Sequence, residues 1–257
     1  MSGRVEGRVA LVTGAGRGIG QATCVRVAEE GAEPVVTSRS AQHVEETCDL
    51  VEGITGRRPL GLPLDVADVG AVDRVVDEAA ERLGRIDIVV ANAGFGLPEA
   101  PAVHDTSDAD WERLFAVNVT GVFAVCRAAL RHMPDGGAIV TVGSINSFVS
   151  WPGDGPYSAT KGAVLQLTRG LAVDLAPRAI RANCVCPGVI DTPFTQLWLD
   201  RAEDREALAA EYAAVAPLNR MGTAREIANC IVFLASDEAS FVTGAALVAD
   251  GGTVIRP

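Results

Sequence analysis

Aromatic residues are scarce in this chain of 257 residues: they make up 5% of it, whereas hydrophobic residues make up 48%. Its core must therefore be built mainly from Ala, Val, Leu and Ile. This composition favours buried parallel strands that are flanked by Ala-rich helices. The chain is long enough to bury a sizeable core of that kind.

Clusters of basic residues are also missing. The formal net charge is −11, and the sequence contains no basic stretch that could follow a line of phosphates. This argues against nucleic acid and against an anionic membrane surface as partners. We therefore expect a small-molecule substrate.

Long hydrophobic runs are absent as well. Arg4, Glu6 and Arg8 lie near the start, and only a short apolar run, residues 9–12, follows them, so we expect no secretory signal. The longest uncharged stretch, residues 136–153, is interrupted by Gly, Ser, Asn and Pro and is not typical of a membrane span. The sequence predicts a soluble, cytoplasmic protein.

The six cysteines form no Cys-x-x-Cys motif, which indicates reduced thiols rather than a disulfide framework. They are Cys24, Cys48, Cys126, Cys184, Cys186 and Cys230. Cys184 and Cys186 would share one face of a strand, but His43, His104 and His132 supply no ligand cluster near them. We expect no metal site.

A glycine-rich turn lies between two regular elements near the start of the chain. Residues 8–13 suit a buried strand, and residues 21–30 predict a helix that ends at Gly31. The turn between them reads Gly14, Ala15, Gly16, Arg17, Gly18, Ile19, Gly20. An ordinary flexible turn could also be rich in glycine. Between a strand and a helix, however, glycines let the backbone approach a pyrophosphate at the helix N-terminus, so we predict nucleotide binding.

Strands and helices continue to alternate after this turn. The predicted strands cover residues 34–37, 60–64 and 86–91, and the predicted helices cover residues 41–52 and 69–83. Such alternation predicts a parallel sheet with helices on both faces. No linker, repeat or low-complexity tract interrupts it, so we expect residues 1–257 to form one domain.

The second strand ends at Ser38 and Arg39, about twenty residues after the glycine turn. In this type of sheet a carboxylate here would accept hydrogen bonds from the ribose of NAD, whereas Arg accommodates the 2′-phosphate of NADP. No carboxylate is present, and Arg17 could add a second positive charge. Both arginines could instead be solvated surface residues. We expect NADP(H) to be preferred, with NAD(H) as the alternative.

Polar residues also follow the next two strands. Asp65 and Val66 follow the third, and Asn92, Ala93 and Gly94 follow the fourth. Ligands of open α/β sheets bind beyond the carboxyl ends of the strands, so we expect these five residues to border the nucleotide.

Residues 108–133 predict one long amphipathic helix, capped by Ser107 or Asp108. Asn118 lies on its apolar face. A polar amide there is either a satisfied core residue or part of a site.

Tyr157 and Lys161 are four residues apart, so on a helix they lie on one face. A tyrosine that exchanges protons near neutral pH needs its anion stabilised by roughly 4 kcal/mol. A cation about 4 Å away is worth roughly that much at an effective dielectric of about 20. Ser144 ends the strand predicted over residues 137–142, thirteen residues before Tyr157. The two hydroxyls could converge on one substrate oxygen.

These motifs together resemble those of the short-chain dehydrogenase/reductase family, in the same order and over nearly the whole chain. The residues that carry the resemblance are Thr13, Gly14, Gly18, Ile19, Gly20, Asn92, Ala93, Gly94, Asn118, Ser144, Tyr157, Lys161, Pro187 and Gly188. The resemblance implies a Rossmann fold with a doubly wound, seven-stranded parallel sheet. It also implies NAD(P)-dependent transfer of hydride between a nicotinamide and a carbonyl or secondary alcohol.

The resemblance further implies a role for each residue of the site. Tyr157 would be the acid/base and would also contact the cofactor, and Ser144 would hold the substrate oxygen. Lys161 would lower the pKa of Tyr157 and bind the nicotinamide ribose, and Asn118 would position a water molecule. The residues expected to pack against the nicotinamide and its amide are Pro187, Gly188, Ile190 and Thr192.

Two departures from the family pattern are visible. Ala91 stands where the family often has a first Asn, and the Asp that is usual near Ser38 in NAD-preferring members is missing. The second departure again favours NADP.

Residues 191–221 resemble the mobile substrate lid of the family, with a helical part at residues 200–215. Aromatic and apolar side chains of this segment and of the loop before Tyr157 predict a fairly apolar ketone or alcohol as substrate, although each could instead belong to the core or to an interface. These side chains are Phe148, Trp151, Phe194, Leu197 and Trp198. By resemblance, residues 245–249 form the last strand at a subunit interface, and we expect a homotetramer, or else a dimer.

Two alternatives remain open from the sequence. One is a 3-oxoacyl-thioester reductase of the acyl-carrier-protein type. The other is a non-catalytic, nucleotide-sensing protein on the same fold, which would need the glycine turn but not Ser144, Tyr157 and Lys161.

Overall fold

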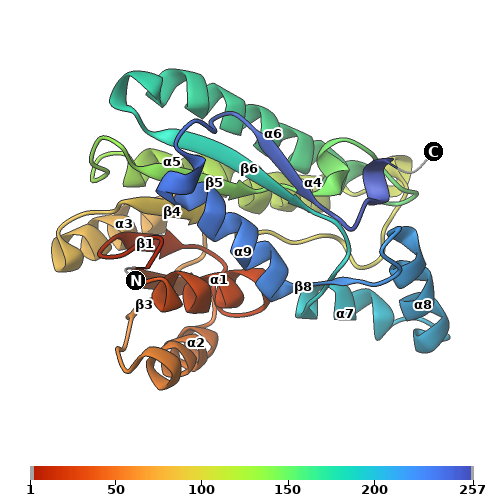
Figure 1. The fold of residues 1–257 in the computed structure, drawn as a ribbon. Helices are drawn as coiled ribbons and strands as arrows, with labels where there is room; N and C mark the ends of the chain where they lie inside the picture. The colour runs from red at the N-terminus through yellow and green to blue at the C-terminus, as the bar shows by residue number, and fades with distance from the viewer. Residues whose placement is uncertain (1–2, 256–257) are drawn as a thin grey trace.

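A seven-stranded, fully parallel sheet forms the centre of the computed structural model, which describes residues 3–255 (Figure 1). The ends of the predicted domain at residues 1–2 and 256–257 lie outside the described residues. The strand order is β3-β2-β1-β4-β5-β6-β9, which confirms the predicted sheet. The strands are β1 Val9–Val12, β2 Glu33–Ser38, β3 Leu60–Pro63, β4 Ile88–Ala91, β5 Ala138–Val142, β6 Arg181–Pro187 and β9 Ala246–Ala249. A separate two-stranded sheet pairs β7 Ile190–Asp191 with β8 Gly222–Thr223.

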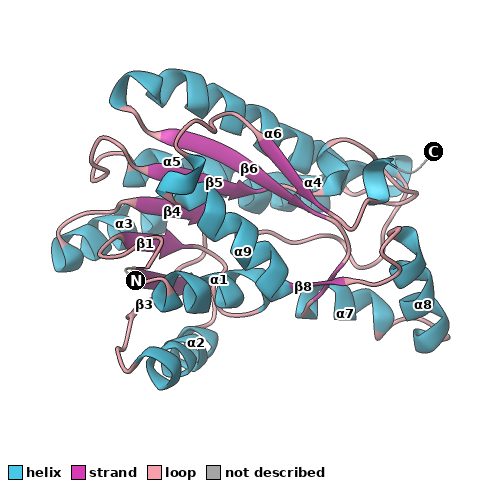
Figure 2. Ribbon diagram, viewed as in Figure 1, coloured by secondary structure: helices cyan, strands magenta, loops and turns pink. Residues whose placement is uncertain are grey.

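Helices cover both faces of the large sheet (Figure 2). One face is covered by α1 Gly18–Glu29, α2 Ala41–Thr55 and α9 Ala224–Ala235. The other is covered by α3 Val69–Leu83, α5 Gly121–Ala129 and α6 Gly155–Leu175, with α4 Asp108–Phe115 leading into α5. Short 3-10 turns are η1 Val103–Asp105, η3 Ile145–Ser147, η4 Ala176–Arg178, η5 Asp237–Ala239 and η6 Thr253–Ile255.

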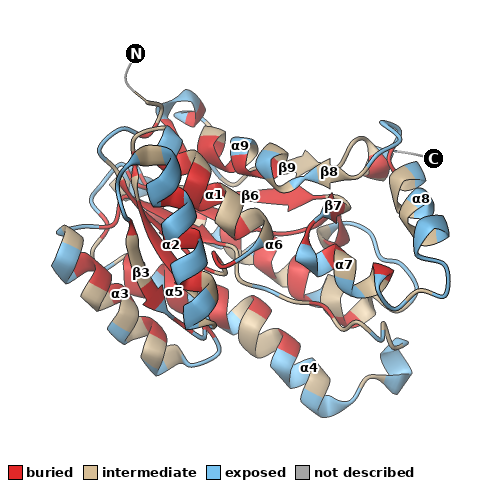
Figure 3. Cartoon of the chain, turned by 90° about the horizontal axis from the view of Figure 1, so that it is seen from below, coloured by how far each residue is buried: buried red, intermediate tan, exposed pale blue. Residues whose placement is uncertain are grey.

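The first strand shows why the sheet is buried on both sides. Val9 and Leu11 pack into the cluster under α3, α5 and α6, whereas Ala10 and Val12 pack into the cluster under α1, α2 and α9. This alternation follows from the two-residue period of a strand. Figure 3 shows the resulting buried centre between helices that are exposed on their outer sides. The strand order reverses at β1 and β4, where open parallel sheets bind their ligands.

Helix α3 begins and ends at the residues predicted from the sequence, 69 and 83. The Asp68 side chain accepts a hydrogen bond from the backbone N–H of Ala71, and Gly84 ends the helix in the left-handed conformation (φ 83°). These are the expected N-cap and C-cap chemistries.

The single long helix predicted over residues 108–133 was wrong in two respects, the first being that α5 ends at Ala129. Ser107 caps its start, as expected, but a π-turn, η2 Ala116–Thr120, separates α4 from α5. Asn118 lies inside this turn. A one-turn π-helix inside an α-helix is common at functional sites.

The lid segment contains two helices rather than one. α7 Pro193–Leu199 precedes the predicted helical part. α8 Arg205–Val215 is capped by Asp204, whose side chain accepts a hydrogen bond from Ala207 N. α8 buries none of its residues, and Figure 1 shows it beside α7, away from the centre of the sheet. Among residues 3–255, no helix combines the length and the apolar character that crossing a membrane requires.

Candidate active site

The glycine turn after β1 is held by the end of β4. The Asn92 side-chain amide donates to the carbonyl oxygens of Thr13 (2.8 Å) and Gly14 (3.1 Å). Gly14 has φ 63°, and a Cβ added to it would lie 2.8 Å from the Cα of Ala93. The turn therefore needs glycine at this position for its conformation and for its close approach to β4.

The N-terminus of α1 fits an anionic ligand. Its N-cap residue, Arg17, makes no side-chain capping hydrogen bond, and no acidic residue lies in the first turn. Gly18 has φ 58°, and a Cβ there would meet Thr192 at 3.4 Å. The backbone N–H groups of the first turn and the positive end of the helix dipole are thus available to a pyrophosphate. These features match what a dinucleotide requires.

The end of β2 lies against the glycine turn. A Cβ added to Gly16 would lie 2.8 Å from Ser38 Oγ and 2.6 Å from the Cβ of His43. Arg17 follows Gly16 in the chain and Arg39 follows Ser38, and both arginines are exposed. Neither side chain has a hydrogen-bond or ion-pair partner among the described residues. His43 is a further basic side chain at this place that the sequence did not single out.

Asp65 and Val66 have different environments. Asp65 is exposed beyond β3, and its side chain accepts a hydrogen bond from Ala67 N at 3.0 Å. Val66 is only 6% exposed, and a Cβ at Gly121 would lie 2.8 Å from its Cγ2. The Val66 side chain therefore belongs to the core under α5, because an apolar side chain gains more from packing there. Only its backbone is left for the nucleotide contact that we expected.

The loop after β6 contains the residues expected at the nicotinamide. Gly188 passes close to the last strand, since a Cβ there would lie 2.8 Å from Asp250 Cα. Ile190 is 5% exposed and packs under Gly222, so its side chain is part of the core. Pro187 is buried at the end of β6, and Thr192 is 8% exposed at the start of α7, beside Gly18.

Asn118 is buried and fully hydrogen-bonded. Its amide nitrogen donates to Phe95 O (2.8 Å) and Thr160 Oγ1 (3.1 Å), and its oxygen accepts from Phe95 N (3.0 Å). It thus links the loop after β4 to α6. A Cβ at Gly94 would lie 3.3 Å from Asn118 Oδ1 and 3.4 Å from Lys161 Nζ, so the amide and the ammonium border the same glycine.

Tyr157, Ser144 and Lys161 come together where β5 ends and α6 begins. The side-chain hydroxyls of Ser144 and Tyr157 interact with each other. Lys161 Nζ lies 5.5 Å from the centre of the Tyr157 ring and donates to Val142 O at 2.9 Å. The structure therefore brings together the three side chains that the sequence predicted.

The pKa of Tyr157 does not follow the expectation that Lys161 lowers it. Burial raises the pKa of Tyr157, the hydrogen bond from Ser144 opposes this shift, and the negative charge of Asp154 adds to it. Lys161 is itself desolvated, because burial lowers its pKa to about 8. Its ammonium is directed at a backbone carbonyl rather than at the phenol, so the chain alone leaves Tyr157 protonated at neutral pH.

An aromatic wall stands over Tyr157. Its ring centre is 6.0 Å from that of Phe194, which is 4.8 Å from that of Trp198. A Cβ at Gly96 would meet Phe194 at 3.2 Å and Trp198 at 3.3 Å. Other predicted pocket side chains are partly exposed nearby in the sequence, at Phe148, Trp151 and Leu197. The wall suits an apolar group next to the reacting carbon.

The sequence did not single out three polar neighbours of Ser144 and Lys161, namely Asn146, Ser147 and Asp154. Ser147 Oγ donates to the backbone oxygen of Lys161 at 2.9 Å, and Asn146 contacts both Ser144 and Asp154. All three lie in the loop or cap between β5 and α6, where polar residues are ordinary turn formers. Only their spacing around Ser144 could have singled them out.

The comparisons with known proteins agree with this geometry. A family model described as enoyl-(acyl carrier protein) reductase matches residues 14–254. The chain is 42% identical to 2-(R)-hydroxypropyl-CoM dehydrogenase of Xanthobacter autotrophicus, over 95% of this chain and 97% of the relative. It is also 42% identical to cis-4-hydroxycyclohexanecarboxylate dehydrogenase of Sinomonas cyclohexanicum, over 95% and 96%. The crystal structure of carveol dehydrogenase from Mycobacterium avium in complex with NAD superposes with a TM-score of 0.91 at 34% identity, covering 99% of this chain and 100% of that one.

Proposed function

The chain belongs to the short-chain dehydrogenase/reductase family, and we propose that it transfers hydride between NADP(H) and a fairly apolar ketone or secondary alcohol. One observation carries the proposal. The hydroxyls of Ser144 and Tyr157 meet at the carboxyl edge of the sheet, with buried Lys161 one helical turn further along α6. A nucleotide-sensing protein would not need this arrangement.

In the proposed mechanism, Ser144 donates a hydrogen bond to the substrate oxygen while Tyr157 exchanges a proton with it. A bound nicotinamide supplies or accepts the hydride. Because burial raises the pKa of Tyr157, the phenol is ready to donate its proton in the direction of ketone reduction. In the direction of alcohol oxidation, the phenolate must be stabilised by positive charge around it.

Lys161 and Asn118 connect the reacting group to the cofactor. We assign Lys161 to the nicotinamide ribose as well as to Tyr157, because its buried ammonium borders Gly94 at the end of β4. Asn118 holds the loop after β4 against Thr160 of α6. We propose that it keeps these elements aligned and positions a water molecule near Lys161.

The preference for NADP over NAD rests on the end of β2. Arg17 and Arg39 are exposed beside Ser38 without a carboxylate partner among the described residues, and no carboxylate ends the strand. Guanidinium groups bind phosphate by paired hydrogen bonds. The 2′-phosphate of NADP would meet both.

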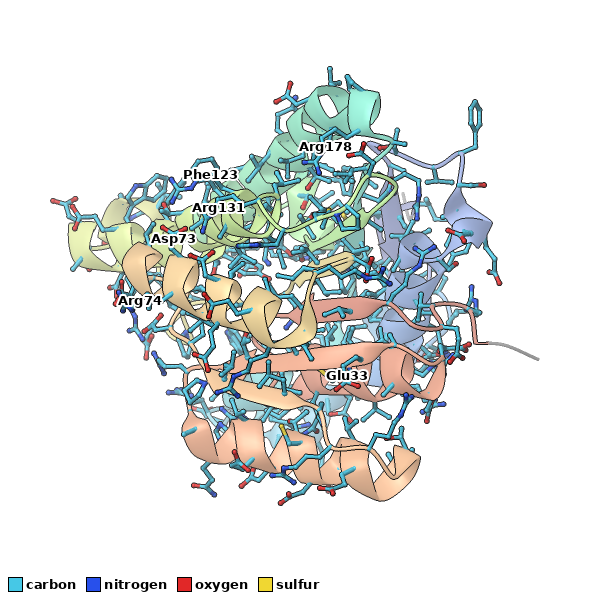
Figure 4. All side chains as sticks on the ribbon, turned by 90° about the vertical axis from the view of Figure 1, so that its left-hand side faces the viewer. Glu33, Asp73, Arg74, Phe123, Arg131 and Arg178 are labelled. Carbon is cyan, nitrogen blue, oxygen red and sulfur yellow. The ribbon has the colours of Figure 1, made fainter. Side chains whose placement is uncertain are left out.

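We also propose a homotetramer, because two separate surfaces expose apolar side chains. On α5 and α6, Phe123 is 45% exposed and Val173 is 75% exposed. Near β9, Phe241 and Leu218 are exposed as well. Figure 4 shows Phe123 on the outer side of α5, beyond the pair formed by Asp73 and Arg131. Two self-complementary surfaces generate a tetramer with three twofold axes, and light scattering would measure its mass.

We further propose that residues 1–257 act as one domain, in the cytoplasm. All six cysteines are free thiols in the structure, which suits a reducing compartment.

The decisive experiment is a substrate panel in which NADPH consumption is followed, with NADH in parallel. Cyclohexanone and other small cyclic ketones represent the proposed class, and acetoacetyl-CoA represents a 3-oxoacyl-thioester reductase, the activity named for a relative from Thermotoga maritima that is 37% identical to this chain. We expect faster turnover of the cyclic ketones. Faster turnover of the thioester would replace the first assignment by the second, and no turnover of any carbonyl compound would favour the nucleotide sensor.

A further inference from the structure

A buried amide lies two residues after Ser144. Asn146, in the turn η3, is 8% exposed. Its amide nitrogen donates to Asp154 Oδ2 at 2.9 Å and to Ser158 Oγ at 3.1 Å. Both N–H groups of the amide are therefore used by α6 and its N-cap residue, so the orientation of the amide is set and its oxygen faces Ser144.

Asn146 contacts the Ser144 hydroxyl in two ways. Its backbone N–H donates to Ser144 Oγ at 3.1 Å, and its side-chain oxygen accepts from Ser144 Oγ at 3.3 Å. The backbone contact holds the oxygen of the hydroxyl. The side-chain contact gives the hydroxyl hydrogen an acceptor before substrate binds. The Ser144 hydroxyl thus bridges Asn146 and Tyr157.

Asp154 completes the chain of contacts from the other side. It is half-buried at the N-cap of α6, and burial raises its pKa. Asn146 is the one hydrogen-bond partner of its carboxylate among residues 3–255, and no ion pair there involves it. A desolvated carboxylate with an amide as its partner gives a strong, charge-assisted hydrogen bond, which fixes the amide firmly.

We propose that Asn146, held by Asp154 and Ser158, is a positioning residue that fixes the Ser144 hydroxyl for its contact with the substrate oxygen. The heavy atoms stay in place while the hydroxyl hydrogen turns from the Asn146 oxygen to the substrate. The inference rests on the proposed function, in which Ser144 and Tyr157 perform the proton chemistry.

The first test is Asn146→Ala, assayed at saturating NADPH with cyclohexanone or acetoacetyl-CoA, whichever wild type reduces faster. We expect kcat to fall about 10-fold to 100-fold, as for other small misplacements of reacting groups. KM and the NADPH dissociation constant should change less than about 3-fold, because Asn146 contacts neither strand end at the nucleotide. Wild-type kcat in this variant would overturn the proposal.

A paired exchange separates positioning from simple loss of folding. Asn146→Asp places two carboxylates together at the former 2.9 Å contact, so kcat should fall at least as far as with Ala. In the double variant Asn146→Asp with Asp154→Asn, the new amide can donate to the new carboxylate, which still accepts from Ser144. We expect the double variant to be at least about 10-fold more active than Asn146→Asp alone. Equal kcat in the two, with Tm values like that of wild type, would contradict the proposal.

Two controls complete the design. Ser150 accepts a hydrogen bond from Ser158 Oγ at 3.0 Å, at the exposed end of the same network. Ser150→Ala should leave kcat within about 2-fold of wild type, because surface substitutions of this kind are nearly neutral. Tyr157→Phe identifies which idea fails: if Tyr157→Phe stays active, the proposed function is wrong, whereas an inactive Tyr157→Phe beside a fully active Asn146→Ala removes only the present inference.

Discussion

The nucleotide edge of the sheet and its reacting edge are built in opposite ways. At the ends of β1 and β2, glycines clear space, and Arg17 and Arg39 are exposed without partners among the described residues. At the end of β5, Ser144 and Lys161 are buried, and each already has a hydrogen-bond partner within the chain. The first edge leaves its polar groups for the ligand to satisfy, whereas the second is organised before any ligand arrives. Substitutions should therefore change affinity at the first edge and turnover at the second.

The largest effect is expected at the reacting edge. Tyr157→Phe removes the proton donor while keeping the ring that packs near Phe194. We expect kcat to fall about 1,000-fold, within the range for loss of general acid catalysis. NADPH affinity, measured by fluorescence titration, should stay within about 2-fold of wild type, because the phenol hydroxyl acts in proton transfer and adds little to cofactor binding. Turnover at the wild-type rate would rule out the assignment of Tyr157.

Lys161→Met should break the comparison, because Lys161 belongs to both edges. The variant removes a buried ammonium that donates to Val142 O and borders Gly94. We expect kcat to fall about 100-fold, and the NADPH dissociation constant to rise as well. Steady-state kinetics and fluorescence titration measure the two effects. A change in kcat with unchanged cofactor affinity would place Lys161 at the reacting edge alone.

Arg39→Ala should sharpen the comparison by changing affinity only. Loss of a charge-assisted hydrogen bond to phosphate costs about 1.5–3 kcal/mol, so NADPH should bind roughly 10-fold to 100-fold more weakly. NADH binding should change less than about 2-fold, since NADH has no 2′-phosphate. Equal losses for the two cofactors would disprove the NADP preference.

Arg57→Ala is the matched control for Arg39→Ala. Arg57 is also exposed, but it lies before β3, at the opposite end of the sheet from the nucleotide site. Its removal should leave both dissociation constants unchanged.

The last prediction is a shift in pH dependence, which is measured by the position of the pH profile and not by its height, because Asp154→Asn also weakens the hydrogen bond that holds Asn146. The carboxylate of Asp154 raises the pKa of Tyr157 by repelling the phenolate. Asp154→Asn removes this charge, so the pKa of Tyr157 should fall, and the rise of kcat/KM with pH in alcohol oxidation should begin at a lower pH. Asp174→Asn, an exposed change further along α6, should leave the pH profile where it is. A shift toward higher pH in Asp154→Asn would contradict the electrostatic argument.

The same difference between the two edges explains what could be predicted from the sequence. The glycine turn and the strands carry local patterns, and helices such as α3 begin and end at their predicted residues because their caps are local too. The reacting edge depends on contacts between polar residues of the loop after β5. In the sequence, these residues look like ordinary turn formers. Asn146 and Asp154 carried no motif, and their roles become visible only through the 2.9 Å hydrogen bond between them.

Two further differences have tertiary causes. The pKa of Tyr157 is governed by burial, which the spacing of Tyr157 and Lys161 cannot reveal. The interruption of the helix over residues 108–133 comes with the contacts that Asn118 makes to Phe95 and Thr160. Neither the pKa of Tyr157 nor the π-turn follows from sequence periodicity, because both depend on residues that are distant in the sequence and close in the fold.

The π-turn at Ala116–Thr120 has an evolutionary consequence. A π-turn is equivalent to one residue inserted into an α-helix, and each α-helical residue turns the chain by about 100°. Removing one residue from this turn would give a straight helix, but it would rotate either Asn118 or the buried face of α5 by that angle. The buried face includes Val122, Val125 and Ala129. The extra residue therefore lets Asn118 face the site while the following residues of α5 still face the core. A deletion here should be far less tolerated in descendants of this chain than one in an exposed loop.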